Sequence, residues 1–543
     1  MTTRSNGDDA GVTPIDPQRK CMNREANAGN NGGSRCMMRA FAGSIPPIHS
    51  RSLSHFHAHP IMADLPLGPS PLAASLDRSR PWYRELTRYH WFVLSVAALG
   101  WLFDCLDQQL FTLARRPAMI SLLHAPGGGA PTADQIDGYA GYATSIFLMG
   151  WATGGIIFGV LGDRIGRAKT MLWTILLYSL FTGLSALSTG FWDFAAYRFL
   201  TGLGVGGEFA VGVALVAEAM PDRARPFALG LLQALSAVGN VSAALINMTL
   251  GWMVESGQID PGNAWRYMFV VGTIPALMAV VVFKYVKEPE RWQAAAHKGA
   301  AAKQLGSYRE LFGVPRWRRN AIIGLLLAFA GVVGLWGIGF FTVDLMDSVL
   351  RLRFAREMSG STQLTIEGIK HALSADQLKQ LEGTVAWWKG ITAIMQNLGG
   401  FFGIWAFSRG THLVGRKPAF AVAFVAAAAS TALVFWRLNE FSQIFWMVPI
   451  MGFCQLSLFG GYAIYFPELF PTRLRSTGTS FCYNVGRFVA AVGPFIRSLL
   501  IDHAFKDTSE PIRYAGISMC AIFLVGLFVI PFAPETRGKP LPE

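Results

Sequence analysis

Two carboxylates lie close together in an otherwise apolar stretch of the chain. Asp104 and Asp107, inside residues 99–110, are spaced i and i+3 and therefore share one face of a helix. An ionised carboxylate at the centre of a bilayer costs about 2.5–3.5 kcal/mol on insertion scales, so such residues usually face a water-filled path or a proton relay. We predict that Asp104 binds a coupling proton, with Asp107 as the second choice. The alternative is that one of the two only pairs with a helix end.

A single arginine lies deep inside a later apolar segment. Tyr483, Asn484 and Arg487 are spaced i, i+1 and i+4 on one predicted helix. A planar guanidinium matches a carboxylate with two parallel hydrogen bonds, which favours an anionic substrate at Arg487. Alternatively, Arg487 only neutralises Asp344. Seven residues on other segments are candidates to complete the cavity, although each alone is more often a packing residue: Gln233, Asn240, Trp336, Gln396, Asn397, Gln455 and Tyr462.

These side chains must be positioned by helices that cross a membrane. The 543 residues are 52% hydrophobic and only 15% charged, which is too apolar for an ordinary soluble surface. The net charge of +13 comes with a mean hydropathy of +0.35, which argues against a nucleic-acid binder or a disordered chain. About 20 apolar residues cross the hydrocarbon core, and twelve such segments recur: 91–115, 138–161, 170–189, 192–219, 227–250, 265–286, 319–347, 385–408, 418–436, 441–466, 476–501 and 512–533.

The polar stretches predict how the chain is organised around these segments. The longest basic break, 287–318, divides the helices six and six, and by the positive-inside rule this loop and both termini are cytoplasmic. The external loop 348–384 has helix-forming composition over 367–382, which predicts a short helical cap. We therefore expect five parts: a disordered cytoplasmic tail 1–80, a first bundle 81–286, a central loop 287–318, a second bundle 319–534 and a cytoplasmic tail 535–543.

The two halves repeat each other. Glu218 and Arg225, at the end of the fourth predicted helix and just after it, recur as Glu468 and Arg475 around the end of the tenth, an offset of 250 residues. A parallel repeat of this kind places a binding site between the halves near the midplane of the membrane.

The loop after the second helix carries the most specific motif. Residues 159–169 contain Asp163, Arg164 and Arg167, and they closely resemble the signature loop between helices two and three of the major facilitator superfamily, with a weaker counterpart at 409–417. The resemblance covers about 85–540 and implies an all-α membrane protein, with twelve transmembrane helices in two six-helix pseudo-symmetric bundles. Nine residues are gating candidates: Asp163, Arg164, Arg167, Arg198, Glu218, Arg225, Arg416, Glu468 and Arg475.

The gating contact of the second half is expected to be weaker than that of the first. Phe407 and Ser408 stand where the second loop should carry an Asp, and three extra residues occur there. A carboxylate can meet the cations and helix termini of the neighbouring bundle, whereas these two side chains carry no charge.

Further motifs resemble particular branches of the superfamily. Residues 288–292 and 534–538 look like flanking motifs of sugar porters and organic-acid:proton symporters, and Asp104 with Asp107 looks like the pattern of aromatic-acid and sialic-acid symporters. Arg198 and Glu208 match the metabolite and sialic-acid branches, where they imply a buried ion-pair network and add Glu208 to the proton-coupling candidates. Segment 227–250 lacks the Gly-Pro motif of drug exporters, which favours import.

These observations predict a proton-coupled transporter in a bacterial inner membrane. The expected substrate is a small carboxylate-bearing metabolite such as a sialic or aromatic acid, a neutral sugar is the second candidate, and a non-transporting sensor is the third. We expect a monomer that binds its substrate, protons and lipid but no nucleic acid, cofactor or metal. Enzyme motifs such as H-E-x-x-H and G-x-S-x-G do not occur, and the six scattered cysteines predict no disulfide framework.

Overall fold

The computed structural model describes residues 81–543 except 125–130, 261, 298–303, 362–363, 367, 494–495, 497–498 and 509. This described part is built from helices and contains no strand, in agreement with the predicted all-α class. The predicted tail 1–80 lies outside the described residues.

The first half contains seven α-helices after a short 3₁₀ segment, η1 (Trp82–Glu85). The predicted helix 265–286 is divided at Gly272–Ile274 into two pieces, because Pro275 begins the second piece and cannot donate a backbone hydrogen bond. The helices are α2 (Arg88–Leu122), α3 (Ala133–Arg164), α4 (Arg167–Ser185), α5 (Phe191–Ala219), α6 (Arg225–Glu255), α7 (Ala264–Val271) and α8 (Pro275–Tyr285).

The second half follows two short helices of the central loop, α9 (Glu290–Ala296) and α11 (Tyr308–Gly313). Its last two predicted segments are each interrupted rather than continuous. The elements are α12 (Pro315–Ser359), α13 (Ile369–Ala372), α14 (Ala375–Val414), α15 (Arg416–Arg437), α16 (Phe441–Leu469), η2 (Thr472–Leu474), α17 (Arg475–Asn484), α18 (Gly486–Ala490), η3 (Leu500–Ala504), α20 (Pro511–Met519), α21 (Ile522–Val529) and η4 (Ile530–Phe532).

Nine stretches of the described residues are long and apolar enough to cross a membrane. They coincide with nine of the twelve predicted segments. The other three predictions, 170–189, 385–408 and 476–501, fall on α4, α14 and the region of α17 and α18.

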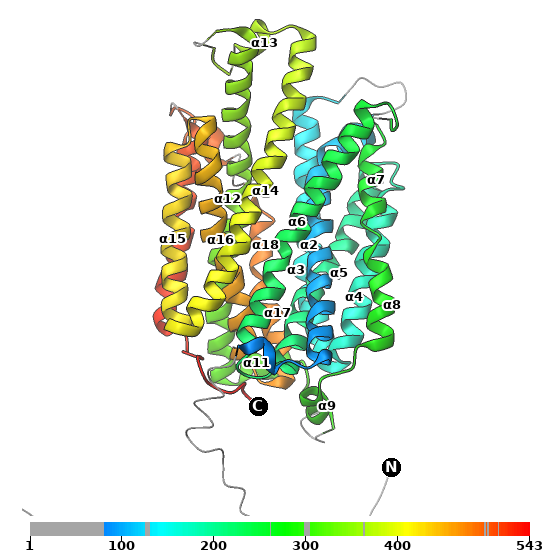
Figure 1. Cartoon of the computed structure of the whole chain (residues 1–543), viewed down its shortest axis with the longest axis vertical. Helices are drawn as coiled ribbons and strands as arrows, with labels where there is room; N and C mark the ends of the chain where they lie inside the picture. Colours follow the sequence, from blue (N-terminus) through cyan, green and yellow to red (C-terminus); the bar gives the residue numbers. More distant parts are fainter. Residues whose placement is uncertain are drawn as a thin grey trace, which may run out of the picture. The chain divides into compact units, whose positions relative to one another are not determined.

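The predicted external loop 348–384 is largely helical, so the expected short cap is wrong in extent. With 45 residues, α12 extends about 68 Å, more than twice the roughly 30 Å of a hydrocarbon core. Figure 1 shows α13 at the tip of the hairpin that α12 and α14 form. Ion pairs between α12 and α14 hold this hairpin together, because Asp347 contacts Lys389 at 2.9 Å and Arg351 contacts Glu382 at 2.6 Å.

Glycines bring the helices of each half into backbone contact. A Cβ added at Gly154 would lie 2.0 Å from the Leu203 carbonyl oxygen, which joins α3 to α5. A Cβ at Gly403 would lie 2.0 Å from the Phe453 carbonyl oxygen, which joins α14 to α16 in the same way. The offset of these glycines is 403 − 154 = 249 residues, so the repeat extends to the packing of the helices.

Replacing Gly154 with Ala is expected to destabilise the protein by about 1–3 kcal/mol, because backbone atoms cannot move aside as a flexible side chain can. The thermal unfolding midpoint of the purified protein measures this effect. Gly410→Ala is the matched control, since an added Cβ there meets nothing within 4 Å. Equal midpoints for the two variants would contradict the packing argument.

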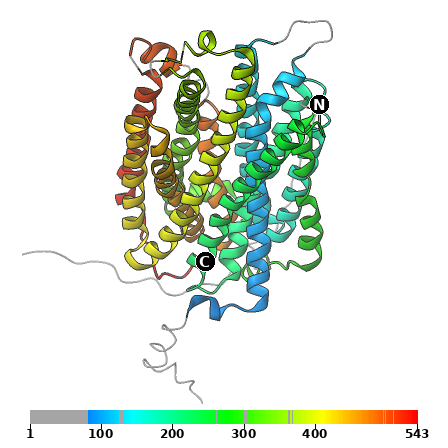
Figure 2. The ribbon, with the colours of Figure 1, turned by 45° about the horizontal axis from the view of Figure 1, so that its top comes forward.

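Several helix pairs join the halves, and two of these pairs are the most extensive. Helix α3 packs against α17, and α6 packs against α14. Figure 2 shows α6 in green beside α14 in yellow. Residues that lie far apart in the sequence therefore meet along these two contacts.

Candidate functional site

A buried ion pair joins α2 to α5 at the centre of the first half. Arg198 Nη1 lies 3.8 Å from Asp107 Oδ2, and both side chains are fully buried. The Thr182 hydroxyl donates to Asp107 Oδ1 at 2.5 Å. Asp107 is therefore both neutralised and hydrogen-bonded, as a buried carboxylate must be to remain charged.

Asp104 and Glu208 are buried carboxylates without a cation bonded to them among the described residues. Neither oxygen of Asp104 has a hydrogen-bond partner, and Glu208 uses only Oε2, which accepts from Thr174 at 2.8 Å. Glu208 lies against α2, because a Cβ on Gly100 would be 2.2 Å from Glu208 Oε1. The network expected for Arg198 and Glu208 is thus different in detail: Arg198 pairs with Asp107.

Arg487 is buried, and no carboxylate of the described side chains forms an ion pair with it. Its Nη1 donates to the Tyr483 carbonyl oxygen at 2.5 Å and to Asn484 Oδ1 at 3.0 Å, while Nε has no partner. The guanidinium carbon lies 4.1 Å from the Trp151 ring centroid and 4.4 Å from that of Tyr483. Ring faces therefore cover the guanidinium, and its Nε edge remains available. The side chain of Asp344 is outside the described part, so the alternative pairing stays a prediction.

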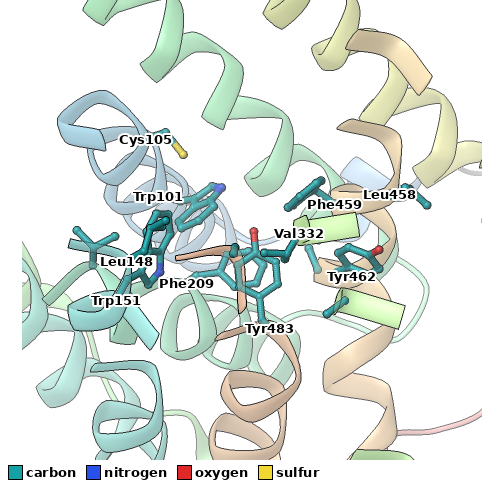
Figure 3. Close-up of a cluster of buried hydrophobic side chains, with 14 of the residues drawn as sticks. Trp101, Cys105, Leu148, Trp151, Phe209, Val332, Leu458, Phe459, Tyr462 and Tyr483 are labelled. Carbon is teal, nitrogen blue, oxygen red and sulfur yellow. The ribbon is translucent and has the colours of Figure 1, made fainter. Parts of the chain in front are cut away.

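Aromatic rings from both halves gather in this region, and Figure 3 shows Trp101, Trp151, Phe209 and Tyr483 close together. Tyr483 stacks on Phe209 with centroids 4.0 Å apart, and Trp101 lies 4.6 Å from the same Phe209 ring. Trp336 of α12 contacts Trp151 edge-on at 6.1 Å. Arg487 also lies within electrostatic reach of Asp104, so the carboxylates and the arginine form one central cluster.

The other predicted binding residues lie in separate contacts. The Asn240 amide donates to Asn397 Oδ1 at 2.7 Å and joins α6 to α14. Gln455 bonds Thr431, and the Tyr462 hydroxyl donates to the Leu327 carbonyl oxygen at 2.7 Å, so both side chains are satisfied within the second half. Gln233 is buried with an unpartnered Oε1, and Gln396 lies half-buried on α14.

The structure also places residues in the cluster that the sequence did not indicate. They are Trp101, Trp151, Phe209, Thr174 and Thr182, which touch the arginine, its aromatic neighbours or the carboxylates. Four of them look like ordinary apolar or hydroxyl positions of a membrane helix. Two of the five lie close to a candidate in the sequence, since Trp101 is three residues before Asp104 and Phe209 directly follows Glu208.

Asp163 joins the two halves at one end of the helices, which we call the Asp163 end. Its carboxylate accepts from the backbone N–H groups of Ser476 and Thr477 at 3.1 and 2.8 Å, and from the Thr477 hydroxyl at 2.6 Å. These donors form the first turn of α17, where the helix dipole also favours a negative charge. Arg167 Nη2 lies 3.0 Å from the same carboxylate.

A second contact between the halves lies beside it. Glu218 Oε1 accepts from Arg167 Nη2 at 2.9 Å and from Arg475 Nη1 at 2.8 Å, and all three side chains are buried. Arg167 also donates to the Thr472 carbonyl oxygen at 2.7 Å. The predicted gating residues Asp163, Arg167, Glu218 and Arg475 therefore form one continuous network.

The remaining gating candidates have local partners. Arg225 pairs with Asp222, and Arg164 donates to the Leu305 carbonyl oxygen at 3.3 Å. Arg416 pairs with Glu468 at 2.7 Å inside the second half.

At the offset of 249 residues His412 takes the position of Asp163 in the second half and Ser408 that of Gly159, so the expected three extra residues do not occur. The Ser408 hydroxyl donates to the Pro226 carbonyl oxygen at 3.0 Å, at the start of α6. Ser408 thus contributes one neutral hydrogen bond between the halves, whereas Asp163 accepts three hydrogen bonds as a charged group, so the contact made by Ser408 is the weaker one.

One carboxylate follows each bundle, and each of the two caps the start of a helix at corresponding positions in the two halves. Glu288 accepts from the backbone N–H groups of Arg167 and Lys169 at the start of α4, and Glu535 accepts from those of Arg416 and Lys417 at the start of α15. Partial burial alone would raise the pKa of the Glu535 carboxyl, but these backbone donors and that of Arg537 hold its pKa below the ordinary value. The predicted flanking motifs therefore have a structural role in both halves.

Replacing Asp163 with Ala is expected to open the Asp163 end. The loss of hydrogen bonds to a charged group costs about 1.5–3 kcal/mol each, against about 1 kcal/mol for the neutral bond lost in Ser408→Ala. Hydrogen exchange of residues 159–162 and 476–480 measures the opening, and we expect faster exchange in the Asp163 variant than in the Ser408 variant. Equal exchange in both variants would contradict the asymmetry.

Comparisons with known proteins agree with this arrangement. The profile of the Major Facilitator Superfamily matches residues 117–365. A cis,cis-muconate transport protein of Acinetobacter baylyi is 29% identical over 398 residues, which cover 72% of this chain and 85% of the relative. The sialic acid transporter NanX of Escherichia coli is 25% identical over 451 residues, 83% of this chain and 96% of the relative.

The fold is similar to that of a solved transporter. The structure of the proton:xylose symporter XylE bound to 6-bromo-6-deoxy-D-glucose aligns with a TM-score of 0.63 and 17% identity, over 83% of this chain and 98% of that chain. The chain is therefore similar to transporters of the Major Facilitator Superfamily, and its long apolar helices together with these bacterial relatives support an integral membrane protein.

Proposed function

We propose that this protein imports a small, planar carboxylic acid together with protons, by alternating access between two six-helix bundles. The observation that carries the proposal is Arg487, a buried guanidinium whose Nε edge has no partner and whose faces are covered by Trp151 and Tyr483. An arginine presented in this way binds a carboxylate by its edge.

The surroundings of Arg487 favour an unsaturated or aromatic acid over a polyhydroxylated one. Trp101, Trp151, Phe209 and Tyr483 offer ring faces and edges, on which a flat substrate can stack. A sugar needs many hydrogen-bonding groups, and the amide of Asn484 is already occupied by Gly206, Ser480 and Arg487. The relative that transports cis,cis-muconate, an unsaturated dicarboxylate, supports the same class.

The charge balance at the centre supports coupling to protons. Asp104, Asp107 and Glu208 are three buried carboxylates, and Arg198 and Arg487 are the two guanidinium groups near them. A bound acid would bring the number of negative charges to four, against the two positive charges of Arg198 and Arg487. Protonation of Asp104 or Glu208 reduces this excess, so substrate and proton are expected to bind together.

The network at the Asp163 end supports a gating role. In this conformation it joins the halves through Asp163, Glu218 and Arg475, and these contacts must break before the central cluster can open toward that end. We assign this end to the cytoplasm, because the basic central loop lies there. The proposed topology has twelve membrane helices, with both termini cytoplasmic, in a monomer of the inner membrane.

The test is uptake by proteoliposomes that contain the purified full-length chain. The panel contains benzoate and cis,cis-muconate, sialic acid, and the neutral sugars glucose and xylose, each with and without an inward proton gradient. We expect gradient-dependent accumulation of one planar acid. Accumulation of sialic acid alone would correct the substrate class, whereas accumulation of a neutral sugar would overturn the role of Arg487.

A further inference from the structure

A cavity lies away from the central cluster. It has a volume of about 550 Å³ and lies between the first turn of α12 and the segment 531–542, which we call the 531–542 segment. Three cationic side chains line it, Arg316 and Arg319 from α12 and Lys539 from the 531–542 segment.

The acidic residues of this cavity are already compensated. Glu468 accepts from Arg416 at 2.7 Å and from the Thr536 hydroxyl at 2.5 Å. Glu535 accepts from the backbone N–H groups at the start of α15. Neither carboxylate therefore needs the cations of the cavity.

The cations have no such compensation among the described residues. Arg316 lies 4.8 Å from the Trp317 ring centroid and forms no ion pair there, and Arg319 donates only to the Phe532 carbonyl oxygen at 3.1 Å. Lys539 likewise forms no ion pair with a described carboxylate. The cavity therefore presents an excess of positive charge.

The position of the cavity places it beside lipid headgroups. The membrane-spanning stretch of α12 begins at Pro315 and the last one ends at Phe532, and both residues line the cavity. Phe532 is 63% exposed, so an apolar ring stands at the cavity beside the cations. Basic residues at this depth attract anionic headgroups, and arginine binds phosphate oxygens with paired hydrogen bonds.

We propose that this cavity binds a phosphate-bearing anion, either the headgroup of an anionic phospholipid or a soluble phosphate ester. The site is independent of the substrate site at Arg487.

Hydrogen bonds connect the lining of this cavity to the contact between the halves at the Asp163 end. Pro542 lines the cavity, and its carbonyl oxygen accepts from Arg475 Nη2 at 3.2 Å. Arg475 in turn pairs with Glu218 of the first half at 2.8 Å. Neighbouring Leu541 is buried, at 5% exposure, so the 531–542 segment is packed against the bundle. A ligand that bridges α12 and this segment therefore stabilises the closed Asp163 end.

The experiment measures thermal unfolding of the full-length protein in detergent as ligand is added. The probes are dioleoyl-phosphatidylglycerol, dioleoyl-phosphatidylcholine and glycerol 3-phosphate. We expect phosphatidylglycerol to raise the midpoint by about 3 °C at saturation, since a ligand that binds only the folded state stabilises it. The same increase with glycerol 3-phosphate identifies a soluble phosphate ester as sufficient, and an increase with phosphatidylglycerol alone identifies the lipid.

Matched variants separate the cavity from general surface charge. The double variant Arg316→Gln/Lys539→Gln is expected to lose the increase. Arg437→Gln is the control and keeps it, because Arg437 also lies on a tryptophan, 4.6 Å from the Trp436 ring centroid, but outside the cavity. An equal increase with phosphatidylcholine, an increase that survives in the double variant, or no increase with any probe would each overturn the proposal.

Discussion

Replacing Arg487 with Gln is expected to raise the KM for carboxylate uptake by about 100-fold, because a buried charged partner of this kind contributes about 2–5 kcal/mol. Arg487→Lys keeps the charge but loses the planar edge, so we expect an intermediate increase of about tenfold. Initial uptake rates over a range of acid concentrations in proteoliposomes measure both values. No described carboxylate is bonded to Arg487, so the substitution leaves none of them without a direct partner.

Two controls accompany this prediction. Arg437→Gln removes an exposed arginine from the end of α15 and is expected to leave KM unchanged. The thermal midpoint of each variant shows whether the protein is still folded. A folded Arg487→Gln variant with the parental KM for acids would contradict the proposal that Arg487 binds the carboxylate of the substrate.

Replacing Asp104 with Asn is expected to abolish accumulation against a gradient while exchange of the acid across the membrane continues. Both Asp104 oxygens are buried without a hydrogen-bond partner, which is a site that a proton can occupy and leave without disturbing a bond. With an inward gradient of one pH unit, one coupled proton supports up to about tenfold accumulation, and the variant is expected to reach a ratio of about one. Steady-state accumulation and counterflow exchange in the same proteoliposomes provide the two measurements.

Asp107→Asn is the informative comparison. It leaves Arg198 as a buried cation without its partner, and breaking a buried pair costs about 3–5 kcal/mol. We therefore expect loss of folded protein rather than selective loss of coupling. If Asp104→Asn still accumulates the acid tenfold, or if Asp107→Asn folds normally and is merely uncoupled, the two roles are assigned to the wrong residues.

The sequence predicted the arrangement best where charge stands in an apolar context. Asp104, Asp107 and Arg487 were conspicuous for this reason, and the structure brings them into one cluster. The repeat was equally informative, since the offset of 250 residues pointed to Glu218 and Arg475, which bond each other across the halves. The energetic cost of a charge in an apolar segment and the internal repeat can both be recognised from residue type and position alone.

Hydrogen-bond and ion-pair partners that depend on tertiary packing could not be predicted from the sequence in that way. Arg198 lies on the same helix as Glu208 yet pairs with Asp107, because α2 and α5 bring Asp107 to it. Tyr462 and Gln455 looked like ligands, but their polar atoms bond within their own half. Trp151 and Phe209 could not be distinguished from other aromatic residues of the membrane helices. The length of α12 was missed because its charged continuation resembles a polar loop.

The glycine contacts have a consequence for how motion is distributed in the molecule. With Gly154 and Gly403 placing backbone on backbone, the pairs α3 with α5 and α14 with α16 cannot slide without steric collision. Each half is then expected to move as a rigid body rather than to deform internally. A displacement of the helices at the central cluster is therefore expected to move their far ends as well. Little of the free energy gained on substrate binding is then spent on internal deformation.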